Sequence, residues 1–149
     1  MLAVPYQVLQ YYWDHSKVRY SPSPEQEAFH RALLEPGGTE DEPQPRLAVV
    51  GGGLQSGKSY SSGHHVLGRC MVDDLTWLTG RRYVDAVHEY EYTRDAAVRM
   101  NVALEKDCSY AKDGPWEMKF INGHVLKTLS SDDVTRLSGE APDGILMCE

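Results

Sequence analysis

One short segment of the sequence combines the residue types that bind a nucleotide phosphate. Residues 51–59 read GGGLQSGKS, and from residue 52 they match the pattern GxxxxGK followed by Ser or Thr. In such a loop, glycines let backbone N–H groups face a phosphate, a lysine reaches the β- and γ-phosphates, and a hydroxyl binds Mg²⁺. We therefore expect an ATP- and Mg²⁺-binding loop formed by Gly52, Gly53, Leu54, Gln55, Ser56, Gly57, Lys58 and Ser59, with Ser59 on the metal.

The sequence around this loop predicts a strand before it and a helix after it. The apolar run RLAVV at residues 46–50 is typical of a short buried strand. After the loop, Val66, Leu67, Cys70 and Met71 recur at helical spacing. A helix that begins at the loop would direct its positive end toward the bound anion. The alternative is a flexible glycine turn with a chance lysine, and the strand–loop–helix context favours phosphate binding.

Hydrolysis would need an acid at the end of a neighbouring strand. Residues 145–149 read ILMCE, which predicts a buried strand followed by Glu149. A carboxylate there could polarise the attacking water, although Glu149 could also be a solvated chain end. Cys148 stands where P-loop ATPases usually carry an aspartate, and a thiol is a poor Mg²⁺ ligand. Ser59, phosphates and water would then hold the metal, with support from Glu149 or from another acid (Asp132, Asp133, Asp143).

The remaining elements form an alternating pattern of helices and strands. We expect a helix near residues 6–13, then one with Ser23 as N-cap and Pro24 in its first turn. An acidic loop should follow at 35–45, a strand at 76–80, and one or two helices at 82–106. Residues 116–129 predict a β-hairpin whose Asn122 and Gly123 both adopt positive φ. The inner face of the long helical stretch is expected to hold Val84, Val87, Tyr90, Ala97 and Val98.

This pattern predicts an α/β fold of the P-loop NTPase type, with a mostly parallel sheet flanked by helices. We divide the chain into an N-terminal helical segment (1–45) and an ATPase core (46–149). Because no closing helix follows the last strand, we expect the core to be one piece of a longer domain.

Composition narrows the possible partners and compartments. The chain has 149 residues, a formal net charge of −7, and no apolar run long enough to span a membrane. The negative charge disfavours tight DNA binding by this chain alone, but not a contact made inside an assembly. Its three cysteines (Cys70, Cys108, Cys148) form no CxxC pair and no even framework, which favours a reducing, cytoplasmic setting.

Four blocks in this order resemble the ATPase domain of the large terminase subunit of tailed bacteriophages, the motor that packages DNA into capsids. They read PSPEQ, GGGLQSGKS, TWLTGRRYVDAVHEYEYTRD and FINGHVLKTLSSDDVTRLSGEAPDGILMCE. The resemblance covers roughly residues 20–149, and its most specific part is RLSGEAPDGILMCE. It implies a P-loop ATPase with an additional strand and a catalytic glutamate, which translocates double-stranded DNA in a homo-oligomeric ring. The portal and the small terminase subunit would be its partners, in the host cytoplasm.

The resemblance also implies roles for two residues outside the glycine loop. Gln26 would contact adenine, although it could instead be an exposed helix residue. Arg136 would reach the γ-phosphate held by a neighbouring subunit, where an arginine stabilises the charge of the transition state. It could instead form a loop salt bridge with Asp132, Asp133 or Glu140.

Some features depart from the family or suggest other functions. Many members have an arginine inside the glycine loop, where this chain has Leu54, Gln55 and Ser56, and the nuclease domain is missing. The alternatives are another P-loop NTPase, such as a helicase-like protein or a small kinase, and a nucleotide-binding assembly fragment without turnover.

The adjacent His64 and His65 should point apart on a helix, which disfavours a shared metal ion.

Overall fold

The structure, a computed structural model, describes residues 6–15, 20–34, 38–39, 42–43, 49, 51, 56–133, 135 and 139–148. Its elements are α1 (Tyr6–His15), α2 (Pro24–Leu34), β1 (Gly38–Thr39), β2 (Glu42–Pro43), α3 (Lys58–Cys70), β3 (Leu75–Gly80), the 3₁₀ helix η1 (Tyr83–Ala86), α4 (Val87–Arg99), β4 (Ala103–Cys108), β5 (Glu117–Phe120), β6 (Val125–Ser130) and β7 (Gly144–Met147). The helices expected near residue 6 and from Pro24 are confirmed, and so is the strand expected at 76–80.

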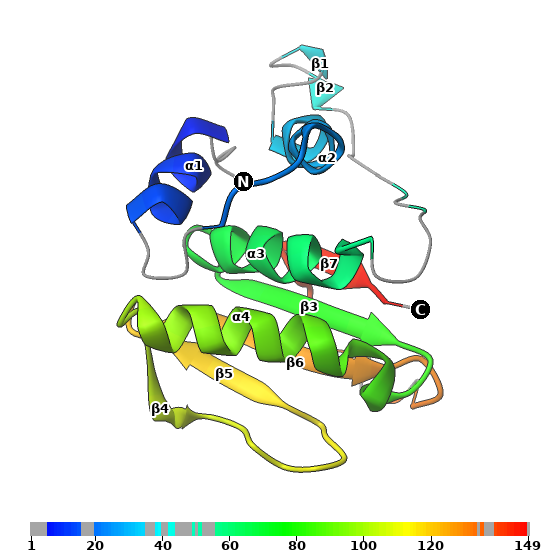
Figure 1. The fold of residues 1–149 in the computed structure, drawn as a ribbon. Coiled ribbons are helices and arrows are strands. Elements are labelled where there is room, and N and C mark those ends of the chain that lie inside the picture. The colour runs from blue at the N-terminus through cyan, green and yellow to red at the C-terminus, as the bar shows by residue number, and fades with distance from the viewer. Residues whose placement is uncertain are drawn as a thin grey trace.

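Five strands form one mixed sheet in the order β4-β5-β6-β3-β7 (Figure 1). β3 runs parallel to β6 and to β7, whereas β5 is antiparallel to both β4 and β6. The expected α/β class is confirmed, but the expectation of a mostly parallel sheet is wrong. The sheet has two antiparallel pairs, β4–β5 and β5–β6, and two parallel pairs, β3–β6 and β3–β7.

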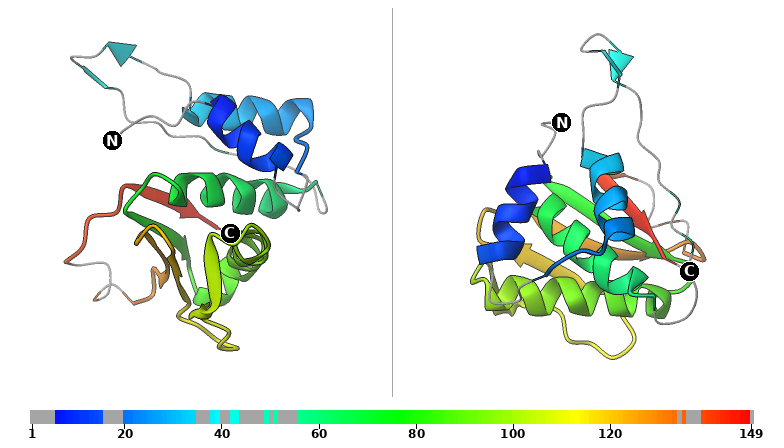
Figure 2. Two further views of the ribbon diagram at one scale, coloured as in Figure 1. Left: turned by 90° about the vertical axis from the view of Figure 1, so that its left-hand side faces the viewer. Right: turned by 45° about the horizontal axis from the view of Figure 1, so that its top comes forward.

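The helices are arranged in two layers relative to the sheet. α3 and α4 pack side by side on one face, and α1 and α2 lie over the outer side of α3 (Figures 1 and 2). The main core lies between the sheet and the α3–α4 layer, and it includes Leu67, Leu78, Tyr90, Met118 and Leu126. A second apolar cluster joins α1 to the following segment and contains Tyr6, Leu9, Trp13 and Tyr20.

α3 is buried on two opposite sides because it lies between these layers. Val66, Leu67 and Cys70 belong to the sheet-side core, as the apolar spacing in the sequence predicted. The other side carries His64, His65 and Gly68, which are also buried. An ideal Cβ on Gly68 would lie 1.6 Å from Leu9 Cδ2, so a glycine at this position permits the close approach of α1.

The edge strand β7 is present where a strand was expected, but it is not fully buried. Ile145 and Met147 are 57% and 80% exposed. β7 is an edge strand of the sheet, and α3 covers only the face of the sheet opposite to Ile145 and Met147. The strand expected at 46–50 lies outside the described residues except for Val49, which is 89% exposed and belongs to no strand.

The prediction of one or two helices at 82–106 is wrong at its C-terminal end. It consists of η1 followed by α4, which ends at Arg99, and residues 103–108 form strand β4. Asn101 has a φ of 57°. The Asn101 and Val102 N–H groups donate to the carbonyls of Val98 and Ala97, which closes the helix. Tyr90 and Ala97 face the core as expected, but Val84 is exposed.

The hairpin expected at 116–129 is confirmed as β5 and β6, with Lys119 opposite Val125. Its turn differs from the prediction, because only Gly123 has a positive φ, of 88°. The Gly123 N–H donates to the Phe120 carbonyl, and the Phe120 N–H donates to the His124 carbonyl. The connection is therefore a four-residue loop, and Asn122 does not adopt the conformation that a two-residue turn requires.

Candidate functional site

The beginning of α3 has the geometry of an anion-binding helix terminus. Gly57 has a φ of 79°, in the left-handed region, and immediately precedes the helix. The Ser61 N–H donates to the Gly57 carbonyl to form the first helical turn. No side chain caps the helix at Gly57, and its first turn holds no acid. Backbone N–H groups at such a terminus attract negative charge. Gly52, Gly53, Leu54 and Gln55 lie outside the described residues.

The N-terminus of α2 meets this loop directly. The Ser23 Oγ accepts from the Gln26 N–H, and the Ser23 carbonyl accepts from the Glu27 N–H, so Ser23 is the N-cap that the sequence predicted. The Ser23 N–H in turn donates to Gln26 Oε1. This leaves the amide nitrogen of Gln26 directed at the Gly57 carbonyl, at 3.5 Å.

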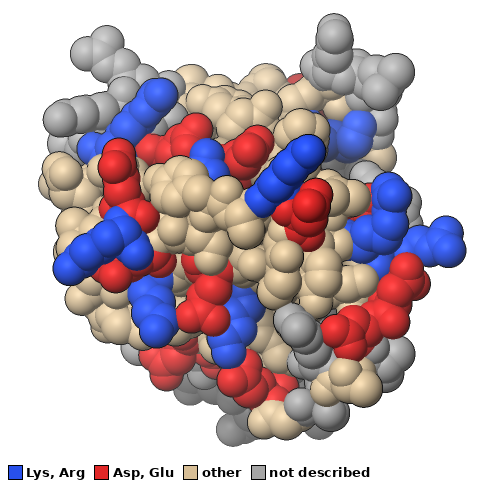
Figure 3. Space-filling view, turned by 90° about the horizontal axis from the view of Figure 1, so that it is seen from below, with Lys and Arg blue, Asp and Glu red and all other residues tan. Residues whose placement is uncertain are grey.

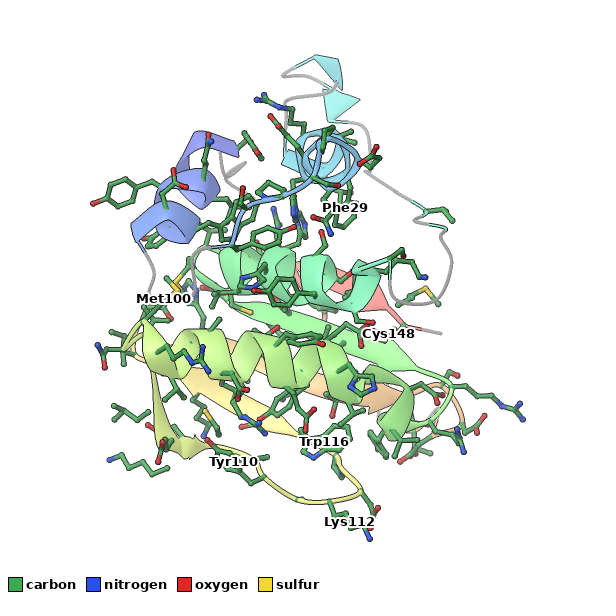
Figure 4. The ribbon with its side chains drawn as sticks, in the orientation of Figure 1. Phe29, Met100, Tyr110, Lys112, Trp116 and Cys148 are labelled. Carbon is green, nitrogen blue, oxygen red and sulfur yellow. The ribbon has the colours of Figure 1, made fainter. Side chains whose placement is uncertain are left out.

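A cavity of about 300 Å³ lies between the two helix termini. It is lined from the α2 side by Ser23, Glu25, Gln26 and Phe29, and from the loop and α3 by Gly51, Ser56, Lys58, Ser61 and Ser62. Phe29 points from α2 toward α3 (Figure 4). Ligand cavities of comparable size combine an aromatic or apolar wall with a few polar groups, as this one does. The structure thus brings together three of the predicted site residues, Gln26, Ser56 and Lys58, whereas the predicted Ser59 is not among the residues that line this cavity.

Beneath this cavity, α2 and α3 are joined by a buried cluster of histidines. The Tyr20 hydroxyl lies 2.9 Å from His30 Nε2 and 2.9 Å from Ser61 Oγ. His30 Nδ1 lies 3.1 Å from His65 Nδ1, and the His64 ring stacks on Tyr20. As the sequence predicted, His64 and His65 point to different partners, but both partners are in the segment 20–34.

Burial shifts the pKa of every ionisable ring in this cluster toward the neutral form. It lowers the pKa of His30 and of His64 to about 4 each, and that of His65 to about 3. The nearby His30 and Arg69 lower the pKa of His65 further. Burial also raises the pKa of Tyr20 to about 12. Neutral imidazoles therefore hold the α2 side of the cavity against α3 at pH 7.

The start of α3 and the η1–α4 segment lie at the carboxyl ends of two strands, near the glycine loop. The strands β3 and β7 end there, and α3 begins there (Figure 1). The Cys148 N–H donates to the Thr79 carbonyl, which continues the β7–β3 pairing to the described end of the chain. Burial and then the neighbouring Glu89 raise the pKa of the Cys148 thiol, so it stays protonated. Glu89, in the first turn of α4, is itself buried.

The other predicted acids and the arginine are placed differently. Glu149 and Arg136 lie outside the described residues. Asp143 cannot support a metal near Ser59, because it lies at the opposite end of the strands. Its Oδ2 accepts from the Leu75 N–H, where β3 begins. Asp132 lies 3.8 Å from Arg81 at the end of β6, and the Asp133 carboxylate accepts from the Thr135 hydroxyl.

The sequence did not identify His30 and the Ser61 hydroxyl as residues beside the cavity, or Glu89 as a neighbour of Cys148. Each lies on a helix that the sequence predicted. Their neighbours are set by the contact of α2 with α3 and by the packing of α4 against α3. The buried Glu89 could have been noticed from its place among the apolar residues of the expected inner face, one position before Tyr90.

The described surface does not form a broad basic patch on the face seen in Figure 3, where Lys and Arg are interspersed with Asp and Glu. Among the described residues, no group of three or more histidine, cysteine, aspartate or glutamate side chains is arranged to hold a metal ion. No helix in the described part of the chain is long and apolar enough to cross a bilayer.

Comparison with known proteins gave no match: no family model fits the chain, and no curated protein or solved structure is significantly similar to it.

Proposed function

We propose that the chain binds ATP with Mg²⁺ at the cavity between α2 and the beginning of α3. One observation carries this proposal: Gln26 lies within 3.5 Å of the Gly57 carbonyl, although the two residues are 31 positions apart in the chain. A group suited to hydrogen-bond a base and a loop suited to bind phosphates thus line one cavity. Lys58 would contact the phosphates, and the Ser59 hydroxyl would bind Mg²⁺.

The test is nucleotide binding by calorimetry for the wild-type chain and for Lys58→Ala. We expect ATP affinity to fall by more than about tenfold, or about 1.4 kcal/mol, because the ammonium group neutralises phosphate charge. Lys112→Ala is the matched control, since Lys112 lies in the loop before β5, on the far side of the molecule from α2 (Figure 4). Equal ATP affinity in wild type and Lys58→Ala would reduce the loop to a structural turn.

We further propose that the chain is the ATPase part of a DNA-packaging motor of the large-terminase type. The support is the order of the four sequence blocks, together with an α/β sheet whose strands β3 and β7 end beside α3. Glu149 would activate the attacking water and Arg136 would act on a neighbouring subunit's nucleotide in a ring. Double-stranded DNA, the portal and the small subunit would be partners within that assembly. The direct test is DNA-stimulated phosphate release, which Glu149→Gln should abolish while leaving ATP binding intact.

One observation favours a second function, nucleotide binding without turnover. Residue 148 is a buried, protonated thiol where an aspartate would normally assist the metal. A chain that binds ATP but releases no phosphate, with or without DNA and at any concentration that allows ring formation, would support this second function over the motor.

A further inference from the structure

Ser61 belongs both to the wall of the cavity and to the buried histidine cluster beneath it. It is one of the residues that line the cavity, and its Oγ lies 2.9 Å from the Tyr20 hydroxyl and 3.3 Å from His30 Nε2. Among the described residues, neither Tyr20 nor His30 is part of the lining. Ser61 therefore gives this buried cluster a polar group at the wall of the cavity.

The protons of the cluster decide what the Ser61 hydroxyl offers to a ligand. Burial raises the pKa of Tyr20 to about 12, so the Tyr20 hydroxyl keeps its proton and donates it to Ser61 Oγ. When the neutral His30 ring holds its proton on Nδ1 and donates it to His65 Nδ1, 3.1 Å away, His30 Nε2 is left to accept from Ser61. The Ser61 oxygen then presents only a lone pair to the cavity and acts as an acceptor.

Ser61 and Phe29 lie beside the same imidazole ring. The Phe29 ring centroid is 5.1 Å from that of His30, whose Nε2 is the atom near Ser61 Oγ. Phe29 also lines the cavity and points from α2 toward α3 (Figure 4). An aromatic side chain is a stacking surface for the flat face of a nucleobase, and the polar groups of a stacked base lie on its edge. Ser61 is thus placed to meet the edge of a base that stacks on Phe29.

From these contacts, and resting on the function proposed above, we propose that the Ser61 hydroxyl accepts a hydrogen bond from the exocyclic amino group of adenine. Tyr20 and His30 are then positioning residues, because they hold the Ser61 proton away from the ligand. A base with a carbonyl oxygen in place of the amino group would set two acceptors against each other, and both would lose their hydrogen bond. Inosine triphosphate (ITP) carries such a base, so Ser61 selects ATP over ITP.

The experiment measures binding of ATP, ITP and inorganic tripolyphosphate by calorimetry, each with Mg²⁺. We expect Ser61→Ala to lower ATP affinity about tenfold, which is the worth of one hydrogen bond, and to leave the affinities for ITP and tripolyphosphate unchanged. The variant should fold, because the Tyr20 hydroxyl keeps a second partner, His30 Nε2, at 2.9 Å. Ser131→Ala is the matched control, since Ser131 is exposed and outside the described lining of the cavity. It should bind all three ligands as the wild type does.

A second variant tests the positioning role and serves if Ser61→Ala does not fold. Tyr20→Phe removes the donor to Ser61 but keeps the ring that stacks on His64. The Ser61 proton can then turn toward the cavity, so the preference for ATP over ITP should shrink. In the Ser61→Ala background, Tyr20→Phe should not change this preference further. A purely structural role of Tyr20 would instead weaken binding of ATP, ITP and tripolyphosphate alike.

The outcomes separate this proposal from the proposed function. A folded Ser61→Ala that binds ATP as the wild type does would overturn the role of Ser61 while leaving nucleotide binding intact. Equal losses of ATP and ITP affinity would also overturn it, because the amino group would then not be the group that Ser61 contacts. A loss that extends to tripolyphosphate would assign Ser61 to the phosphates or to the shape of the site. Absence of ATP binding by the wild-type chain would reject both proposals together.

Discussion

His30 Nδ1 and His65 Nδ1 lie 3.1 Å apart at the junction of α2 and α3, and both rings are buried. Two imidazole nitrogens at this distance share a single proton, so one ring donates and the other accepts. A second proton between them would set two N–H donors against each other and would place a positive charge in a region that excludes water. The junction that holds Gln26 beside the glycine loop therefore depends on neutral histidines.

The first prediction is that stability falls as the pH is lowered below about 6.5, the ordinary pKa of histidine. In the folded protein the pKa values of His30 and His64 are about 4, and that of His65 is about 3. Between these values and 6.5, the unfolded chain binds protons that the folded chain does not. The free energy of unfolding should then drop by up to about 1.4 kcal/mol per pH unit for each histidine.

Urea unfolding at a series of pH values from 7.5 to 4.5 measures this slope. His65→Gln should make the slope shallower, because it removes one of the three titrating groups. His88→Gln is the control, since the His88 side chain is mostly exposed and should leave the slope unchanged. A free energy of unfolding that stays constant between pH 6.5 and 5 would contradict neutral burial of the cluster.

The second prediction concerns base recognition by Gln26. Its amide nitrogen faces the Gly57 carbonyl, and its oxygen accepts from the Ser23 N–H. Gln26→Glu keeps the shape but replaces the donor with a negatively charged acceptor beside the phosphate loop. We expect ATP affinity to fall by about tenfold or more, and the preference for ATP over GTP to shrink. Competition binding with both nucleotides measures this.

Gln10→Glu is the matched control for Gln26→Glu, because Gln10 is an exposed residue of α1 and outside the cavity lining. It adds the same charge to the chain without touching the site. An equal loss of affinity in both variants would mean that net charge, and not the Gln26 amide, governs binding.

Local signals in the sequence were sufficient for several elements around this site. Ser23 followed by Pro24 identified the start of α2, and the spacing of Val66, Leu67 and Cys70 identified the sheet side of α3. These predictions succeeded because each depends on residues a few positions apart, where capping and periodicity operate. The glycine loop could be named as a pattern, but its contact with Gln26 depends on tertiary packing.

Strand β4 was missed because local propensity and tertiary pairing disagree there. Ala103–Cys108 reads ALEKDC, and Ala, Leu, Glu and Lys are strong helix formers. Pairing with β5 nonetheless makes it the edge strand of the sheet, and charged residues are common on such edges. Asn101, which adopts a φ of 57°, was the available signal that the helix ends before it.

The histidine cluster and Glu89 were missed for a different reason. His30 and His65 are 35 positions apart, and no local pattern links them. The sequence gives the helices, but the angle at which α2 crosses α3 decides which side chains meet. The same holds for Glu89 and Cys148, which approach only when α4 packs beside α3 on the sheet.

The third prediction separates backbone strain from packing at the hairpin turn. Gly123 has a φ of 88°, and nothing lies within 4 Å of an ideal Cβ there. Gly123→Ala should therefore cost only the left-handed backbone conformation, about 1–2 kcal/mol. Gly123→Asn should cost less, because asparagine tolerates this region better. Thermal or urea unfolding of the two variants gives the comparison, and equal stability of Gly123→Ala and wild type would contradict the turn geometry.

The last prediction concerns the contact that docks α1 on α3. In a free helix, Gly68→Ala would be favourable by about 1 kcal/mol. Here the added Cβ would lie 1.6 Å from Leu9 Cδ2 and 2.8 Å from Leu9 Cγ, and Leu9 is fully buried. The Leu9 side chain must leave its place, so we expect a net loss of about 2–5 kcal/mol, comparable to deletion of a buried leucine.

A double-mutant cycle with Leu9→Ala tests whether this contact is the cause. Leu9→Ala alone removes the group with which the new Cβ collides, so Gly68→Ala should cost little more in that background. Urea unfolding of the wild type, the two single variants and the double variant gives the four free energies, and a background in which Trp77 and Trp116 are replaced by Phe leaves Trp13, which is buried with Leu9 in the second apolar cluster, as the fluorescent reporter of this junction. If the two costs instead add in full, Gly68 is not needed for the approach of Leu9, and α1 must be held on α3 by other contacts.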